Sequence, residues 1–301
     1  MERARLLSTC LVVGGMGILM AFESIGAPLK PDSFEPSSSS NSGQRTCGMR
    51  EPGLADIQKV RDAHSNAKKP ISTTEDPGPS TPPESILIPV VFHVITSSTG
   101  EGNVSALVDA QVQVINDGYA DTPFFFLVEK VEVIVNDGWF NLGCGTGEER
   151  KAKAALRTGD SRTLNIYTAN LPKTYLGWSS FPWDYTDKPT SDGVVLRYTS
   201  FPGGGYPIPT YDEGLAAVHE IGHWLGLFHT FQGGCKDDDL LASTPAEKGA
   251  SYGCPLGQDT CPRLPGQDSI HNFMNYTDDT CMTEFTDGQL GRMDVMWHAF
   301  R

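Results

Sequence analysis

One run of residues limits the fold of this chain more than any other: positions 219–229 read HEIGHWLGLFH. On a helix, residues i and i+4 lie on the same face, so His219 and His223 would direct two imidazoles at one ion. Gly226 is well placed to end this helix in a left-handed conformation, which costs glycine little. The chain would then turn back and present His229. The sequence therefore predicts a helix, a tight turn and three histidines around one metal ion.

The same run indicates what the metal would do. Three neutral imidazoles leave one position of a zinc ion open, which separates a catalytic site from a closed structural one. Zinc polarises a carbonyl and acidifies water, and Glu220, beside the first histidine, would accept the proton and pass it to a leaving amine. A chance run of histidines is the alternative, but three of the seven in the chain fall at this spacing. We therefore predict a zinc-dependent endopeptidase with Glu220 as general base.

The N-terminus is typical of a secretion signal at residues 1–27. Arg3 and Arg5 precede a mostly apolar run, 11–22, and small residues follow it. A short membrane anchor is the alternative, but this run is well below the roughly 20 residues that span a bilayer. No later stretch is long and apolar enough to span. We expect a cleaved signal and an extracellular protein without a membrane span.

The charge balance argues against a nucleic-acid partner. Asp and Glu number 37 against 23 Lys and Arg, a formal net charge of −14. Neutralising phosphates requires clustered Lys and Arg, which the sequence lacks. The partners that we expect are peptide or protein substrates, and we expect a monomer.

Cysteine usage agrees with export. Beyond the signal, six cysteines remain, an even number that suits an oxidising compartment. Four of them lie between positions 235 and 281, where few hydrophobic residues would order the chain. A disulfide that closes a loop of about 27 residues would contribute roughly 3 kcal/mol of stability. A structural zinc site is the alternative, but the spacing contains no CxxC pair.

The remaining chain divides by composition. Residues 28–84 are rich in Ser and Pro, with one short helix near 54–63, and are predicted to be a pro-segment or linker. The predicted catalytic domain covers 85–301. Its expected strands are 86–95, 124–135, 163–168 and 193–198, and its expected helices are 108–119, 148–157 and a long active-site helix. Pro89 suggests an edge position or a bulge in the first strand. Alternating strands and helices predict a twisted mixed sheet backed by helices.

A second element lies downstream, where positions 272–276 read NFMNY. With the histidine run, it resembles the metzincins, in which a methionine turn lies beneath the zinc ligands. The segments 224–235, 259–261 and 281–286 resemble the pappalysin family, above all its fungal and bacterial extracellular metalloproteases. The resemblance extends from residue 86 to the C-terminus and is strongest after residue 177.

The resemblance implies an α+β fold. A twisted mixed five-stranded sheet, with a backing helix and the active-site helix, would lie over a smaller irregular disulfide-bonded C-terminal subdomain. The substrate would lie in the cleft between them, alongside the strand at 193–198. One Zn²⁺ per chain is implied, and the disulfides implied are Cys235–Cys261 and Cys254–Cys281.

The resemblance also assigns roles near the metal. Met274 would support the zinc ligands from below, and Tyr276 would donate a hydrogen bond to the oxyanion that forms during hydrolysis. A packed aromatic is the alternative for Tyr276. Asp278 and Asp279 fall near the expected specificity pocket and would favour a basic residue just after the cut. They could equally form a solvated acidic turn.

Calcium is a weaker expectation. Members of the family commonly have Asp before a Thr-Pro pair and bind calcium nearby, whereas this chain has Ser243 before Thr244. Asp237, Asp238 and Asp239 nevertheless offer the oxygen ligands that calcium prefers.

Cys47 and Cys144 allow two interpretations. Cys47 lies in an Arg-Thr-Cys-Gly run that resembles the cysteine switch of metzincin pro-segments, where a thiolate occupies the open position of the zinc. Arg45 would then pair with an acidic group in the cleft. The alternative is a disulfide between Cys47 and Cys144.

Two further predictions concern function and modification. A non-catalytic metzincin scaffold that only binds proteins is the rival function, but such proteins usually lose the base or a ligand, and all four residues are intact here. Asn103 and Asn275 begin glycosylation sequons. Asn103 falls in a predicted surface loop and is the expected glycosylation site, whereas Asn275 lies inside the methionine turn and should be unmodified.

Overall fold

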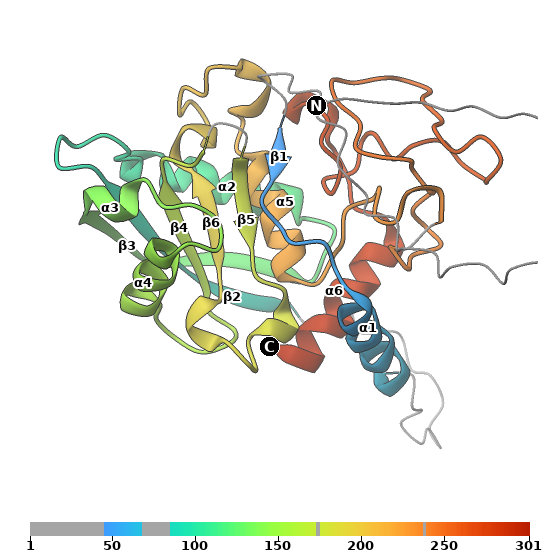
Figure 1. Cartoon of the computed structure of the whole chain (residues 1–301), viewed down its shortest axis with the longest axis horizontal. Helices are drawn as coiled ribbons and strands as arrows, with labels where there is room; N and C mark the ends of the chain where they lie inside the picture. The colour runs from blue at the N-terminus through green and yellow to red at the C-terminus, as the bar shows by residue number, and fades with distance from the viewer. Residues whose placement is uncertain (1–44, 68–84, 173–174, 237–238) are drawn as a thin grey trace, which may run out of the picture. The chain divides into compact units, whose positions relative to one another are not determined.

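The computed structural model describes residues 45–67, 85–172, 175–236 and 239–301 (Figure 1). The predicted signal at 1–27 lies outside the described residues, as does most of the predicted linker. The helix expected near 54–63 is α1 (Leu54–Ala67). No helix among the described residues combines the length and the apolar character that crossing a membrane requires.

A six-stranded sheet organises the described chain, in the order β1-β5-β6-β4-β2-β3. All neighbouring strands are parallel except β5 and β6. The five strands β2 to β6 follow residue 85, so the predicted five-stranded mixed sheet is confirmed, and β1 adds a sixth strand. The strands are β1 (Thr46–Cys47), β2 (Ile86–Thr96), β3 (Phe124–Val135), β4 (Leu164–Ala169), β5 (Tyr175–Ser179) and β6 (Val194–Arg197).

The strand β2 is interior, because it pairs with β3 on one side and β4 on the other. The edge position suggested by Pro89 is therefore wrong, while the register shift between Val90 and Val91 agrees with a bulge. Pairing with β4 starts only at Val90, so on that side Pro89 needs no hydrogen-bond donor.

Side chains of β2 alternate between two layers of core, as the period of a strand requires. Ile88, Val90 and Phe92 pack with residues of α2 (Val108–Gly118) and α5 (Leu215–Trp224). Ile95 packs on the other side with Ala152 of α4 (Gly147–Leu156). Each face of the sheet is therefore covered by its own helices (Figure 1).

Two further helices complete the fold: α3 (Asp137–Phe140) and α6 (Asp287–Phe300). The side chain of Thr286 accepts a hydrogen bond from the backbone of Gln289, and the side chain of Gln289 bonds back to the Thr286 backbone. This reciprocal capping fixes the start of α6. Met296 of α6 packs in one cluster with Val60 and Ala63, which attaches α1 to the C-terminal helix.

The segment between α5 and α6 has only short 3-10 turns as helical structure among its described residues. Two disulfides cross-link it, Cys235–Cys261 and Cys254–Cys281, each with 5.6 Å between the Cα atoms. These are the two bonds that the resemblance implied. The irregular disulfide-bonded subdomain expected beside the sheet is therefore present.

Candidate active site

The helix α5 supplies the first part of the site. It contains ten residues and is shorter than predicted, and His219, Glu220 and His223 on it are all buried. Gly226 has the predicted left-handed conformation, with φ of +96°. A Cβ atom there would lie 2.5 Å from the side chain of Met296, so glycine is required for space as well as for conformation.

Two of the three imidazoles, those of His219 and His223, share one arrangement. Nδ1 of His219 lies 2.7 Å from the Phe273 carbonyl oxygen, and Nδ1 of His223 lies 2.8 Å from that of Leu227. A carbonyl only accepts, so both Nδ1 atoms carry the proton and both Nε2 atoms keep a free lone pair. Nε2 of His223 lies 3.1 Å from Nε2 of His229. The turn after α5 therefore brings the third histidine to the first two.

These nitrogens fit a bound metal ion. Nε2 of His219 is buried and has no hydrogen-bond partner in the described part of the chain, which is an unusual cost unless a ligand satisfies it. Burial lowers the pKa of all three histidines, that of His223 to about 4, so each is in the neutral form that binds metals. Carbonyl acceptors on the outer nitrogens are the usual support for histidine ligands. The donor set suits a divalent cation.

Glu220 lies beside this group in a dry environment. Burial raises the pKa of its carboxyl to about 8. Its side chain packs against Gly177 of β5, where a Cβ atom would lie 2.7 Å from Cγ of Glu220. Because residue 177 is glycine, β5 leaves the space that the Glu220 side chain occupies next to the histidines.

The residues predicted for the methionine turn also border the histidines. Met274 is fully buried, and a Cβ atom on Gly222 of α5 would meet its sulfur at 2.4 Å. The hydroxyl of Tyr276 lies 3.3 Å from Nε2 of His229. Both residues predicted from this turn therefore contact the histidine site.

The N-terminal arm, defined as residues 45–67, reaches the same place. Cys47 pairs with Gly177 across β1 and β5, and its backbone N–H donates to the Tyr276 hydroxyl at 3.1 Å. Its Sγ donates to Oε2 of Glu220 at 3.3 Å. The sulfur and one nitrogen of each histidine all lie within 4.8 Å of one another. The structure thus gathers Cys47 with the three histidines.

The cleft-lining strand expected at 193–198 is not the one beside the site. That segment contains β6, which pairs with β4 and β5 and so has no free edge. The strand beside the site is β5, which sequence reasoning did not find, and β1 of the N-terminal arm pairs along it. The strand β5 has only five residues, with Gly177 at its centre and a hydroxyl-bearing residue at each end. It therefore lacks the apolar run by which longer strands are predicted.

Asp279 does not belong to a solvated turn. It is only 2% exposed, and Nη1 of Arg45 lies 3.5 Å from its Oδ1. Its other oxygen accepts the Glu213 backbone N–H at 3.0 Å. Asp278 beside it is half-buried. The Arg45 partner expected from the sequence is therefore Asp279, although the arginine sulfur contact to Met282 at 3.2 Å was not foreseen.

The alternative disulfide between Cys47 and Cys144 is not present. Cys47 and Cys144 are both free, and Sγ of Cys144 donates to the Gly48 carbonyl oxygen at 3.2 Å. Asn103 is exposed in the loop that follows β2, whereas Asn275 is fully buried.

The residues considered for calcium can be described only in part. Asp237 and Asp238 lie outside the described residues. Asp239 is buried, and one of its side-chain oxygens accepts the backbone N–H of Leu241 at 2.9 Å. Within the described ranges, the groups that could hold a metal contain no Asp or Glu.

Sequence reasoning missed one aromatic contact in the site. Phe231 stacks on His229, with ring centroids 4.7 Å apart and planes 8° from parallel. It also meets the ring of Tyr276 edge-on. The position two residues after the third histidine carried no signal, since aromatic residues are common in cores.

Comparison with known proteins agrees with this geometry. The family model described as pregnancy-associated plasma protein-A, a peptidase family, matches residues 160–297. An extracellular metalloprotease of Neurospora crassa is 38% identical over 262 residues, which cover 85% of this chain and 88% of the relative.

Two solved structures from Tannerella forsythia are also similar. Mature mirolysin in complex with a cleaved peptide has a TM-score of 0.60 at 30% identity, covering 70% of this chain and 91% of the other. A promirolysin mutant has a TM-score of 0.64 at 28% identity, covering 83% and 93%.

The fold and site therefore define an extracellular metallopeptidase of the metzincin class. Within that class, the chain belongs to the pappalysin family, as the sequence resemblance predicted.

Proposed function

We propose that the metal is a single Zn²⁺ held by His219, His223 and His229, and that Glu220 is the general base. The observation that carries this proposal is the set of three buried, neutral imidazoles beside one buried carboxylate. The outer nitrogens of two of them are fixed by carbonyl acceptors, which leaves Nε2 for the metal. When bound, zinc polarises the scissile carbonyl and lowers the pKa of water.

The protein's own groups carry the protons. An oxygen of Glu220 accepts a proton from the attacking water and delivers it to the nitrogen of the leaving amine. Burial raises its pKa to about 8, and a nearby dication favours the charged carboxylate needed for the first step. The Tyr276 hydroxyl, close to His229, donates a hydrogen bond to the developing oxyanion. Met274 fills the space beneath α5 and fixes the histidines.

Cys47 keeps the unprocessed chain inactive in this proposal. Its sulfur lies among the ligand nitrogens, where a thiolate is a strong zinc ligand and excludes the attacking water. Residues 28–84 are then a pro-segment, removed by a cut after the N-terminal arm, and 85–301 form the enzyme. The likeness to promirolysin, which covers 83% of this chain against 70% for mature mirolysin, supports this division.

The position of Arg45 supports a substrate preference. Its guanidinium lies in a buried site against the carboxylate of Asp279. Once the arm has left, Asp279 would be a buried acid without this cation, and a basic substrate side chain would replace it. We therefore expect cleavage before Lys or Arg by a monomeric enzyme.

Digestion of a peptide library by the mature enzyme, read by mass spectrometry, tests these roles. Glu220→Ala should leave one zinc per chain, measured by elemental analysis, while cleavage falls by about a thousandfold or more because the proton acceptor is lost. Asp279→Asn should keep both zinc and activity but lose the preference for Lys and Arg. Cleavage by Glu220→Ala near the wild-type rate would falsify the mechanism.

A further inference from the structure

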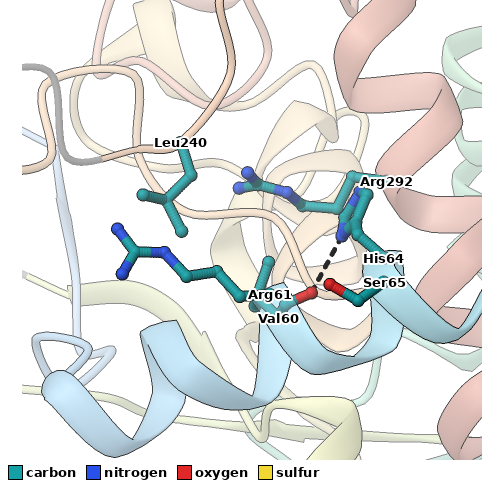
Figure 2. Close-up of a pocket in the computed structure, with 6 residues that line it drawn as sticks. All are labelled: Val60, Arg61, His64, Ser65, Leu240 and Arg292. Carbon is teal, nitrogen blue, oxygen red and sulfur yellow. Dashed lines mark hydrogen bonds between the residues drawn. The ribbon is translucent and has the colours of Figure 1, made fainter.

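A pocket of about 480 Å³ lies between the N-terminal arm and the rest of the chain (Figure 2). Its lining residues are Val60, Arg61, His64 and Ser65 of α1, Leu240, and Arg292 of α6. None of them belongs to the candidate active site. The pocket is therefore lined both by the N-terminal arm and by the catalytic domain, which the proposed activation would separate.

The lining is cationic. Arg61 and Arg292 carry fixed positive charges, Ser65 adds a hydroxyl, and none of the lining residues is acidic. The chain as a whole has a net charge of −14, so the charge of this pocket is opposite in sign to that of the molecule. In the view of Figure 2, the guanidinium groups of Arg61 and Arg292 lie on opposite sides of Leu240. Guanidinium groups in one pocket are suited to a planar or tetrahedral oxyanion.

Arg292 is the buried member of this set, with 1% of its surface exposed. Nη1 donates to the backbone oxygen of Asp239 at 2.5 Å, while Nε has no hydrogen-bond partner among the described residues. Burial lowers the pKa of Arg292 to about 10, although the charge of Asp239 acts in the opposite direction. A buried guanidinium with an unused donor is a costly arrangement that an anion would relieve.

His64 lines the pocket from the N-terminal arm, and its Nδ1 is already engaged. Its Nδ1 lies 2.9 Å from the carbonyl oxygen of Val60, drawn as the dashed line in Figure 2. The carbonyl can only accept, so Nδ1 carries a proton and the ring is held in place on α1. Four residues of the pocket thus lie on α1, and Arg292 faces them from α6.

We propose that this pocket binds a small multivalent oxyanion of the phosphate or sulfate kind, which links α1 to α6. Because Arg61, His64 and Ser65 come from the arm and Arg292 does not, the complete site exists only while the arm is docked. An anion that binds only the docked state stabilises that state by mass action. The anion should therefore slow release of the arm. This consequence rests on the proposed function of the arm, but the binding of the anion itself does not depend on that function.

Binding is tested with the full chain carrying Glu220→Ala, which prevents self-processing. Inorganic phosphate and sulfate are titrated calorimetrically at constant ionic strength, with chloride as the reference. Arg61→Glu should weaken binding by about tenfold or more, because it removes one charge-assisted contact and adds repulsion. Lys59→Glu makes the same charge change on the same helix but outside the pocket, and should bind as the parent does.

A sulfated disaccharide is titrated beside the inorganic ions to identify the source of the oxyanion. Tighter binding of the disaccharide, lost in Arg61→Glu, assigns the pocket to sulfated sugars. Equal or weaker binding assigns it to the free ion. No binding of any of the three probes, or equal weakening in Arg61→Glu and Lys59→Glu, would overturn the proposal.

Linkage to the arm is read without any enzyme assay. In a Cys144→Ser background, the rate at which a thiol reagent modifies Cys47 reports release of the arm. Phosphate should slow this modification severalfold in the parent and leave it unchanged in Arg61→Glu. Binding without slower modification would refute the effect on the arm, while the proposed zinc chemistry would stand.

Discussion

The N-terminal arm and the segment between α5 and α6 border the metal site from different parts of the chain, and they are held in different ways. The segment after α5 is fixed by two disulfides and by a buried polar core, in which Glu247 accepts hydrogen bonds from Ser269 and Asn275 at 2.8 and 2.9 Å.

The arm has no covalent attachment among the described residues. It is held by noncovalent contacts: the pairing of β1, the apolar packing of Val60 and Ala63 against Met296, the Arg45–Asp279 contact, and the partly exposed ion pair of Arg50 with Asp184. Surface ion pairs contribute little, commonly below about 1 kcal/mol. The segment after α5 is therefore held covalently. The described part of the arm is held by noncovalent contacts and can dissociate once the chain is cut, although neither region contains a long apolar run.

The largest effect should come from breaking the arm's contact with the metal site. Cys47→Ala should raise the activity of the unprocessed chain by about a hundredfold or more, since each 1.4 kcal/mol of lost ligand energy opens the site tenfold. Fluorogenic peptide cleavage before any processing measures this. Cys144→Ala is the matched control and should stay inactive. If both variants remain equally inactive, Cys47 is not the block.

A smaller effect should follow from removing one covalent attachment. Replacing both Cys254 and Cys281 by Ser should lower the free energy of unfolding of the mature enzyme by roughly 3 kcal/mol, through the released loop entropy. Urea denaturation with an intrinsic fluorescence probe measures it. Cys144→Ser, which breaks no bond, should leave the midpoint unchanged. An unchanged midpoint in the double variant would mean that the polar core alone holds this region.

The smallest effect concerns that polar core. Burial raises the pKa of Glu247 to about 7, from an ordinary 4.5, so the folded protein binds a proton more tightly than the unfolded chain. Stability from this group is thus present below pH 4.5 and is lost as pH rises through 7. Glu247→Gln should remove a pH-dependent loss of about 2 kcal/mol between pH 5 and 8.

Chemical denaturation at several pH values measures this term as the difference between the variant and the parent. The histidine ligands titrate in both proteins and so cancel in the difference. A parallel pH dependence in parent and variant would show that Glu247 is ionised throughout this range, and that its hydrogen bonds outweigh its burial.

Much of the site could be predicted from the sequence, because its signals are local. The spacing of His219, His223 and His229 depends on the period of one helix, and Gly226 marks the turn that follows. The strands β2 and β3 were found almost residue for residue, since long apolar runs carry a strong signal. The methionine turn and the disulfide pairs came through the family resemblance.

Other features were decided only by the tertiary structure. The strand β5 lies beside the site although its five residues carry little local signal, and Pro89 lies in an interior strand because its partner β4 starts one residue later. Cys47 reaches Glu220 across 173 positions of sequence, and Arg45 reaches Asp279 across 234. Local patterns fix the residues of one helix or turn, whereas the packing of distant segments fixes which strand, acid and thiol meet at the metal.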